Sequence, residues 1–325
     1  MNKTGVLLIN LGTPRSPTPK DVYRYLIQFL TDKRVIDFSW LKRQCLVRGM
    51  IVPMRYRQSA GAYKKIWMDE GSPLLVYGEK VKQALQNSLE ECRVELAMRY
   101  QQPSIEKGLE RLMKDNPEHL IFVPLFPQYA SSTTGSVHEE IMKQMSRYTV
   151  IPKMSFISEY ASHSGMIEAF CARTREHNFM EYDHLLFSFH GLPERQVNRD
   201  LNKPLCYRSQ CYATMDAIVS HLKIPPTMYS ISFQSRLGKE PWLKPYTNET
   251  LLKLAQSGKK RVLVICPSFV CDCLETTYEI STEYANEFLH AGGEKLQLVT
   301  GLNDHPAWID ALKHIVESCR FPMRS

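Results

Sequence analysis

The stretch that decides the fold reads Val262-Leu-Val-Ile-Cys-Pro-Ser-Phe-Val-Cys-Asp-Cys-Leu-Glu-Thr276. Its first five residues form an apolar run that predicts a short buried strand, and its last residues open a helical pattern. A strand that leads through a short loop into a helix is the repeating unit of a parallel sheet covered by helices. In open sheets of this kind, ligands bind at the carboxyl ends of the strands, so the intervening loop is a candidate site.

Strand-like and helix-like segments alternate in the same way along the whole chain. Phe122-Val-Pro-Leu-Phe-Pro127 leads through a polar loop into a helix, as residues 264–269 do, which indicates two related halves. We expect strands at 6–10, 94–100, 119–124, 150–156, 185–189, 228–233, 261–266 and 296–300. We expect helices at 20–31, 40–52, 55–67, 75–90, 105–116, 135–147, 162–177, 207–222, 248–257, 273–290 and 306–318, with caps at Thr18, Ser104 and Thr247.

This alternation predicts an α/β protein with two similar doubly wound, Rossmann-like domains. Each domain is expected to be a four-stranded parallel sheet flanked by helices. We expect the first domain at residues 1–155 and the second, which carries the acidic segment described below, at residues 156–325. The last helix, 306–318, is expected to pack back on the first domain.

The composition is that of a soluble protein. The chain has 325 residues, 43% of them hydrophobic, and no apolar run approaches the roughly 20 residues that cross a bilayer. Nine cysteines, an odd number, and the lack of a secretory signal argue against a disulfide framework and favour the cytoplasm. Neither G-x-G-x-x-G nor G-x-x-x-x-G-K-[ST] occurs, which counts against nucleotide binding. The net charge of +7 is modest, and no nucleic-acid partner is expected.

Residues 33–65 combine basic and apolar side chains in an amphipathic helical pattern. This pattern suits an anionic surface, a membrane face or a carboxylate-bearing ligand. It also suits a helical lobe whose lysines and arginines cover its outer side, the interpretation that composition alone favours. The basic members are Lys33, Arg34, Lys42, Arg43, Arg48, Arg55, Arg57, Lys64 and Lys65.

Acidic residues recur at every fourth position after the strand at 261–266. They are Glu275, Glu279, Glu283 and Glu287. On an α-helix they form a line roughly 18 Å long. Like charges at this spacing destabilise an isolated helix, so the line needs either solvent or a positive partner. Each step of four residues drifts roughly 40° around an α-helix, so we expect the first three acids to share a path and Glu287 to face water.

Further residues suited to chemistry come after other expected strands. His190 directly succeeds the strand at 185–189, and histidine exchanges protons near neutral pH, although a structural histidine bonded to backbone is the alternative. Three other strand ends carry polar or aromatic residues: Arg99 with Tyr100, the hydroxyl-rich run 128–135, and Gln234 with Trp242. The combination indicates a large, flat, partly apolar ligand with a base and acids above it.

Several stretches together resemble one known family. They are Asn10-Leu-Gly-Thr-Pro14, Gly71-Ser-Pro73, Ala97-Met-Arg-Tyr100, Phe126-Pro-Gln-Tyr-Ala-Ser-Ser-Thr-Thr-Gly135, Phe187-Ser-Phe-His-Gly-Leu-Pro193, Gln234-Ser235, Glu240-Pro-Trp-Leu243, Cys266-Pro-Ser-Phe269 and Asp272-Cys-Leu-Glu-Thr276. These stretches run in family order over nearly the whole chain. On them, the chain resembles the ferrochelatases, which insert ferrous iron into protoporphyrin to make haem.

The resemblance implies a lyase of haem biosynthesis that binds protoporphyrin IX and takes Fe²⁺ as a substrate. It implies that His190 and Glu275 form the catalytic and metal-binding pair on opposite sides of the macrocycle, with either one as the proton acceptor. It also implies a path for metal and protons at Asp272, Glu279 and Glu283. The expected porphyrin contacts are Leu11, Tyr63, Arg99, Tyr100, Tyr129, Ser132, Thr133, Gln234 and Trp242.

The resemblance adds a second interpretation of the basic segment. Residues at about 33–67 would form a helical lip of the porphyrin pocket, where Arg55 or Arg57 could meet propionate groups. Because protoporphyrin is sparingly soluble, contact between this lip and a membrane would shorten its path. Coproporphyrin as the substrate remains the nearest alternative, although Leu11 and the helical lip favour protoporphyrin. Leu11 stands where other members have Met or Tyr. A non-catalytic porphyrin or haem carrier is a second alternative, which needs neither His190 nor the acids.

No resident cofactor is expected. Some members of the family hold a [2Fe–2S] cluster, often through a cysteine-rich C-terminal extension, which we do not expect in this chain. Four thiolates could hold such a cluster or zinc, but free buried cysteine is the commoner explanation and the one we prefer. The four candidates are Cys206, Cys211, Cys271 and Cys273.

Overall fold

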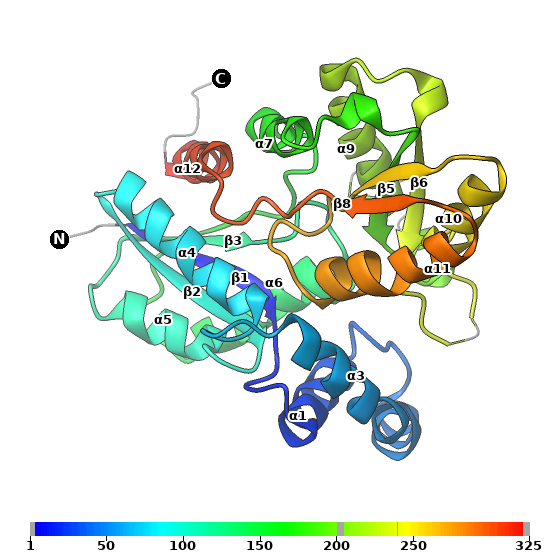
Figure 1. Ribbon diagram of the computed structural model, residues 1–325. Coiled ribbons are helices and arrows are strands. Elements are labelled where there is room, and N and C mark those ends of the chain that lie inside the picture. Colours follow the sequence, from blue (N-terminus) through cyan, green and yellow to red (C-terminus); the bar gives the residue numbers. More distant parts are fainter. Residues whose placement is uncertain (1–3, 200–204, 239, 321–325) are drawn as a thin grey trace. The chain divides into compact units, whose positions relative to one another are not determined.

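The computed structural model describes residues 4–199, 205–238 and 240–320 (Figure 1). The chain divides into two compact units. Unit 1 comprises Met1–Glu159 and Leu312–Ser325, and unit 2 comprises Tyr160–Ala311. The division therefore falls between Glu159 and Tyr160, and the chain returns to unit 1 within its last helix.

Unit 1 contains a four-stranded parallel sheet in the order β2-β1-β3-β4. Its strands are β1 (Thr4–Gly12), β2 (Cys92–Tyr100), β3 (His119–Pro124) and β4 (Lys153–Phe156). Its helices are α1 (Pro19–Leu30), α2 (Trp40–Leu46), α3 (Val52–Ile66), α4 (Pro73–Ser88), α5 (Ile105–Met113) and α6 (Ser136–Met145), with π-helical segments at η1 (Val47–Ile51) and η2 (Ser131–Gly135). Thr18 and Ser104 cap α1 and α5 as expected, because their side chains accept from the N–H groups of Asp21 and Lys107.

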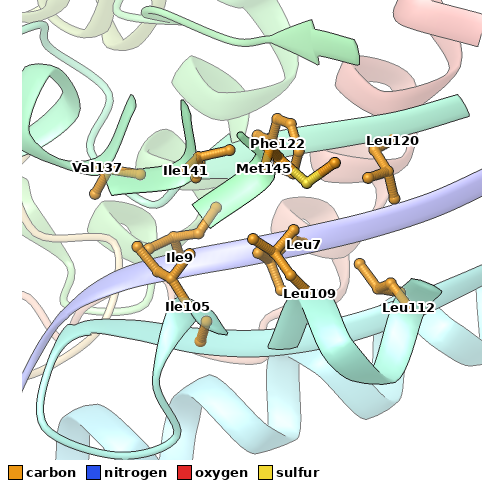
Figure 2. Close-up of a cluster of buried hydrophobic side chains, with 11 residues drawn as sticks. Leu7, Ile9, Ile105, Leu109, Leu112, Leu120, Phe122, Val137, Ile141 and Met145 are labelled. Carbon is orange, nitrogen blue, oxygen red and sulfur yellow. The ribbon is translucent and has the colours of Figure 1, made fainter. Parts of the chain in front are cut away.

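The core of unit 1 lies between the sheet and two amphipathic helices (Figure 2). Alternate residues of β1 and β3 point to one face, where α5 and α6 present apolar side chains three or four positions apart. The labelled members are Leu7, Ile9, Ile105, Leu109, Leu112, Leu120, Phe122, Val137, Ile141 and Met145. This packing fixes the strands whose carboxyl ends carry Leu11, Arg99 and Tyr100.

Unit 2 repeats the plan with a parallel sheet in the order β6-β5-β7-β8. Its strands are β5 (His184–His190), β6 (Tyr229–Gln234), β7 (Arg261–Ile265) and β8 (Lys295–Leu298). Its helices are α7 (Ser164–Arg175), α8 (Glu194–Asn198), α9 (Tyr207–Leu222), α10 (Thr247–Gln256) and α11 (Ala285–His290), with short 3₁₀ turns η3 (Phe179–Glu181) and η4 (Pro226–Met228) and a π-helix η5 (Leu274–Tyr284). The last helix, α12 (Pro306–Arg320), begins in unit 2 and ends in unit 1.

Residues 40–66 form one continuous helical rod, although we expected two helices separated near Pro53. The segments α2, η1 and α3 succeed one another without a gap, and Pro53 lies in the first turn of α3. Proline is tolerated there because its missing N–H falls where the π-helical turn already changes the hydrogen-bond pattern. The expected separate helices at 40–52 and 55–67 were therefore wrong in their boundary.

The segment expected as one α-helix at 273–290 is π-helical over its first eleven residues, Leu274–Tyr284. A π-turn closes its hydrogen bonds over five residues, so a four-residue step stops short of a full turn instead of overshooting it. The expected 40° drift was therefore wrong in direction. Ile280 is fully buried against the sheet together with Phe288 of α11, and this anchors the segment.

Thr247 does not cap α10 as expected, because Tyr246 occupies that position and makes no side-chain cap. The Thr247 side chain instead points into unit 2, where its hydroxyl lies 2.8 Å from that of Ser188 and 2.9 Å from that of Ser232. The short helix α8 was not expected from the sequence.

Candidate active site

His190 is the last residue of β5 and is half-buried. Its Nδ1 lies 2.6 Å from the carbonyl oxygen of Gly191. Because a carbonyl oxygen can only accept, Nδ1 must carry the ring hydrogen, and Nε2 keeps its lone pair. The ring is thus oriented as a base or a metal ligand through Nε2.

The backbone around His190 is held on several sides. The Gly191 N–H donates to the Gln234 carbonyl at 2.8 Å, and the Tyr207 hydroxyl donates to the His190 carbonyl at 2.7 Å. A Cβ at Gly191 would lie 2.7 Å from the Gln234 oxygen and 3.2 Å from the Trp242 ring, so only glycine fits. Trp242 is buried over this turn, and its Nε1 has no hydrogen-bond partner among the residues that the structure describes.

Glu279 lies within a set of hydrogen-bond donors in unit 2. Its Oε1 accepts from the Ser235 N–H at 2.8 Å and from the Tyr284 hydroxyl at 2.6 Å, and its Oε2 accepts from the Ser235 hydroxyl at 2.5 Å. Burial raises the pKa of Glu279, and the donors from Ser235 and Tyr284 reduce that rise. Glu275 raises this pKa further and His190 lowers it, so all three groups interact.

Gln234 connects the acids to a buried row of hydroxyls. Its Nε2 donates to the Glu275 carbonyl at 2.8 Å, and its Oε1 accepts from the Ser188 hydroxyl at 2.6 Å. The exposed fraction of Gln234 is 1%. Both ends of its amide are used inside unit 2, and the expected contact between this side chain and a porphyrin stays a prediction.

The other acids of the line differ in exposure. Asp272 is buried, and it accepts from the Thr276 hydroxyl at 3.0 Å, the Gly301 N–H at 3.1 Å and the Asn303 amide at 2.8 Å. These bonds fix the start of η5. Glu275 is half-buried, whereas Glu283 and Glu287 are exposed.

In unit 1, Arg99 and Tyr100 both donate hydrogen bonds to Asp32, a buried carboxylate that was not predicted from the sequence. The Arg99 guanidinium donates to Asp32 at 2.8 Å and to the Ser136 hydroxyl at 2.7 Å, and the Tyr100 hydroxyl donates to Asp32 at 2.9 Å. Burial opposes ionisation of Asp32, but the bonds from Ser136 and the Arg34 N–H, together with the charge of Arg99, hold its pKa below the ordinary value. Tyr100 is 1% exposed, and its expected porphyrin contact stays a prediction.

The remaining expected porphyrin contacts of unit 1 fall into two groups. Tyr63 is buried, with its ring edge-on to those of Tyr25 and Trp67. Partly exposed positions near the carboxyl end of the sheet are held by Leu11, Tyr129, Ser132 and Thr133. The last two belong to η2, so the hydroxyl-rich run forms a π-helical turn rather than a simple cap.

The four candidate cluster cysteines are buried and free. Burial raises the pKa of Cys211 and of Cys273, and raises that of Cys271 to about 12. A raised pKa favours the neutral thiol, which is a poor metal ligand. Within residues 4–199, 205–238 and 240–320, no group of three or more His, Cys, Asp or Glu side chains is arranged to hold a metal ion. No helix in this part of the chain is long and apolar enough to cross a membrane.

Residues missed by the sequence reasoning include Asp32, Ser136, Tyr207 and Tyr284. Asp32, Ser136 and Tyr207 bond to distant segments, so no local spacing marks them. Tyr284 bonds to Glu279 five residues earlier, a spacing that brings two side chains together in a π-helix but not in the α-helix that was expected. Ser235 was noted only as part of a matching stretch. Its left-handed backbone, with φ at 65°, is a property of the folded turn.

Comparison with known structures identifies the fold. The sirohydrochlorin chelatase SirB from Bacillus subtilis, solved with Fe³⁺, superimposes with a TM-score of 0.57 at 15% identity, covering 97% of this chain and 95% of that chain. CbiX, described as the terminal enzyme of sirohaem biosynthesis in denitrifying bacteria, gives a TM-score of 0.51 at 10% identity, covering 97% of this chain and 98% of that chain. At these identities the likeness concerns the fold alone.

Sequence comparison goes further. The sequence model of the Ferrochelatase family matches residues 3–319. The ferrochelatases of Cronobacter sakazakii and Klebsiella pneumoniae are each 42% identical to this chain, over 98% of it and 99% of each relative. The ferrochelatase of an Escherichia coli strain is 41% identical with the same coverage. The chain belongs to the ferrochelatase family and is an enzyme of haem biosynthesis.

Proposed function

We propose that this enzyme inserts Fe²⁺ into protoporphyrin IX, giving protohaem and two protons. The observation that carries the proposal is His190, whose Nδ1–H is fixed on the Gly191 carbonyl while Nε2 keeps its lone pair. A neutral imidazole in this orientation can accept a pyrrole proton at Nε2. Family membership supplies the macrocycle and the metal as substrates.

Glu275 and Glu279 complete the proposed chemistry. Two pyrrole N–H protons must leave as the metal enters, so the reaction needs acceptors for both. We assign proton acceptance to His190 and metal delivery or the second proton to Glu275, and the two roles can be exchanged. Glu279 and the exposed Glu283 continue the line towards solvent, while Asp272 supports the start of η5.

Porphyrin contacts are proposed separately for each unit. In unit 1 the partly exposed Leu11, Tyr129, Ser132 and Thr133 are proposed contacts, and Arg99 supports them through Asp32 and Ser136. In unit 2 the indole of Trp242 is proposed as a contact. Its buried N–H, without a partner in the described part of the chain, supports this assignment because such a group gains by meeting an acceptor.

One assay tests the proposed function. Anaerobic insertion of Fe²⁺ is monitored by absorbance with protoporphyrin IX and with coproporphyrin as alternative acceptors. We expect faster turnover with protoporphyrin IX, and a large loss of rate in His190→Ala. Faster turnover with coproporphyrin would move the proposal to that substrate, and porphyrin binding without insertion would make the protein a carrier. Near-normal insertion by His190→Ala would refute the mechanism.

We also propose that the rod formed by α2, η1 and α3 contacts an anionic lipid surface. Large apolar side chains stand exposed on it, with Trp40 68% and Met54 76% exposed, and Lys42, Arg48 and Arg55 are exposed beside them. Apolar side chains among basic ones are complementary to a negatively charged bilayer. Flotation with phosphatidylglycerol vesicles should retain the wild type at low salt and lose Trp40→Ala/Met54→Ala. Equal recovery with neutral phosphatidylcholine vesicles, or no flotation, would contradict the proposal.

A further inference from the structure

We infer that Ser235 and Tyr284 are positioning residues that leave Glu279 with one available oxygen, Oε2. Glu279 therefore takes one proton or forms one metal bond at a time and does not chelate. The inference rests on the proposed function, because it assigns a task within the acid line. It names two residues that neither touch the macrocycle in the proposal nor carry a charge.

The acceptor capacity of Glu279 is unevenly used. Oε1 accepts from both the Ser235 N–H, at 2.8 Å, and the Tyr284 hydroxyl, at 2.6 Å. A carboxylate oxygen offers about two lone-pair positions, so Oε1 is saturated. Oε2 accepts from the Ser235 hydroxyl at 2.5 Å, and its other neighbour is the Gln234 amide at 3.4 Å.

The Gln234 amide does not close the second position on Oε2. Its Nε2 makes a shorter bond, 2.8 Å, to the Glu275 carbonyl, and its Oε1 is held by Ser188. At 3.4 Å, a contact between an amide nitrogen and a carboxylate is at the edge of hydrogen-bond range. Oε2 thus keeps one position for an incoming proton or cation, on the side that faces Gln234.

The backbone at Ser235 is arranged for this purpose. Ser235 has φ at 65°, a left-handed conformation that costs a residue with a Cβ some backbone strain. In this conformation one residue presents both its N–H and its hydroxyl to the same carboxylate. Backbone strain of this kind persists where the surrounding structure holds it, and it is concentrated at functional sites.

The charges around Glu279 fit a temporary station for a cation. Its side chain is mostly buried, and no Lys or Arg of the described residues lies within ion-pair distance of it. Three neutral donors therefore stabilise the carboxylate without neutralising it. A pathway for ions needs stations that bind strongly enough to be entered and weakly enough to be left. A carboxylate limited to one metal bond meets the second condition better than one that chelates.

The test compares single-hydroxyl deletions in the full-length chain. Tyr284→Phe returns a lone pair to Oε1, and Ser235→Ala returns one to Oε2. Tyr212→Phe and Ser257→Ala remove exposed hydroxyls elsewhere in unit 2 and serve as matched controls. Mn²⁺ is the probe, and its binding without porphyrin at pH 8 is read from the decrease of its free electron paramagnetic resonance signal.

We expect each variant at Ser235 or Tyr284 to bind Mn²⁺ about tenfold more tightly, the scale of one charge-assisted hydrogen bond. This increase in Mn²⁺ affinity should vanish in the double variant Tyr284→Phe/Glu279→Gln, which would show that the additional binding involves Glu279. In Fe²⁺ insertion, kcat should fall about tenfold and KM for Fe²⁺ should fall with it, because the ion is retained. Both controls should match the wild type in Mn²⁺ affinity and turnover.

Unchanged Mn²⁺ affinity in both Tyr284→Phe and Ser235→Ala overturns the inference, whether or not their activity or melting temperature falls. A merely structural role would lower the melting temperature and leave the affinity of the folded fraction alone. If one variant fails to fold, the other still decides. If wild-type protein lacks iron insertion altogether, the proposed function fails, and the Mn²⁺ comparison continues to report on Glu279 alone.

Discussion

At the carboxyl end of each sheet, a glycine marks the turn of the strand that lies second in the sheet order. A Cβ on Gly12, at the end of β1, would lie 2.0 Å from the Tyr100 carbonyl oxygen, and a Cβ on Gly191, directly after β5, would lie 2.7 Å from that of Gln234. In both units, therefore, the backbone at the end of the central strand packs closely against the last residue of the neighbouring strand: β1 against β2, and β5 against β6. The units differ in the segments beyond their sheets: unit 1 has a hydroxyl-rich π-turn there, whereas unit 2 has an acidic π-helix.

The segments that follow the neighbouring strands, β2 and β6, also make the same kind of hydrogen bond in the two units. After β2, the carbonyl of Pro103 accepts from the Met98 N–H at 2.6 Å, and after β6 the carbonyl of Pro245 accepts from the Phe233 N–H at 2.8 Å. Both prolines come after cis peptide bonds. The backbone plan is thus shared, and the units differ in the side chains that this plan presents.

The buried carboxylates show what the difference means. Asp32 in unit 1 has the counter-ion Arg99 within 2.8 Å, and its pKa is lowered, whereas Glu279 in unit 2 has hydroxyl and backbone donors and a raised pKa. A carboxylate that already has its cation supports structure. One that has donors but no cation can receive a proton or a metal ion that arrives from outside.

The largest effect should come from removing the base of unit 2. His190→Ala should lower kcat of iron insertion by about 10²–10⁴-fold, the usual contribution of a positioned acid or base, measured by anaerobic absorbance assay. The corresponding position near the end of β1 is Leu11, and Leu11→Ala should change KM for the porphyrin more than kcat. Equal losses of kcat in the two variants would break the distinction between the units.

The second comparison concerns stability. Asp32→Ala should lower the free energy of unfolding by about 3–5 kcal/mol, because it takes the nearer carboxylate away from the largely buried Arg99 and leaves only Glu140, at 3.9 Å. Glu279→Gln should leave stability near that of the wild type or raise it slightly, since it strands no cation. Urea denaturation at pH 7 measures both. A destabilisation of similar size in Glu279→Gln would show that the two carboxylates play the same part.

The third comparison uses the two glycines. Gly12→Ala should destabilise by more than Gly191→Ala, because Gly12 also has φ at 117° and its contact is closer. We expect about 1–3 kcal/mol for Gly191→Ala, in the range of overpacked sites, with displacement of Trp242. Thermal melting gives the order of stability, and Trp fluorescence reports the displacement in Gly191→Ala. The reverse order of melting temperatures would contradict the geometry.

The smallest effect is a pH dependence from two buried histidines. His119 of unit 1 and His184 of unit 2 each place Nε2 2.8 Å from a serine hydroxyl on the neighbouring strand, and burial lowers both pKa values, that of His184 to about 4. Between about pH 6.5 and 4 the unfolded chain binds the proton and the folded chain does not, so stability falls as pH falls through this range. His184→Asn should remove about 2 kcal/mol of this dependence.

Urea denaturation of wild type and His184→Asn at several values from pH 7 to pH 4 checks this prediction. The wild type should lose stability relative to the variant on acidification. The same measurement on His119→Asn should show a smaller difference, and parallel curves for wild type and His184→Asn would contradict the assignment.

Much of the fold could be predicted because it depends on periodicity. Apolar runs such as 262–266 and 119–124 are long enough to give both sheets, and the repeated loop after each gives the relation between the halves. The parts that could not be predicted depend on contacts at a distance. No spacing in the sequence shows that Asp32 meets Arg99. Tyr284 and Glu279 are only five residues apart, and their contact was missed because the segment was expected to be α-helical rather than π-helical. His190 and the acids were found because they come after strands, whereas the residues that orient them were not.

The π-helix makes the direction of the acidic side chains sensitive to the number of residues in the segment. A π-turn holds more residues than an α-turn, so deletion of one residue within Leu274–Tyr284 would allow the backbone to return to α-helical pairing. A deletion between Glu275 and Glu279 would then leave three α-helical steps, about 300°, in place of four π-helical steps that nearly complete a turn. Glu279 would rotate by roughly a few tens of degrees relative to Glu275, although no acid had been replaced. The direction of the acidic side chains around the helix axis thus depends on the number of residues between them as well as on their identity. A relative with the same glutamates and one residue fewer would present them at different angles around the helix.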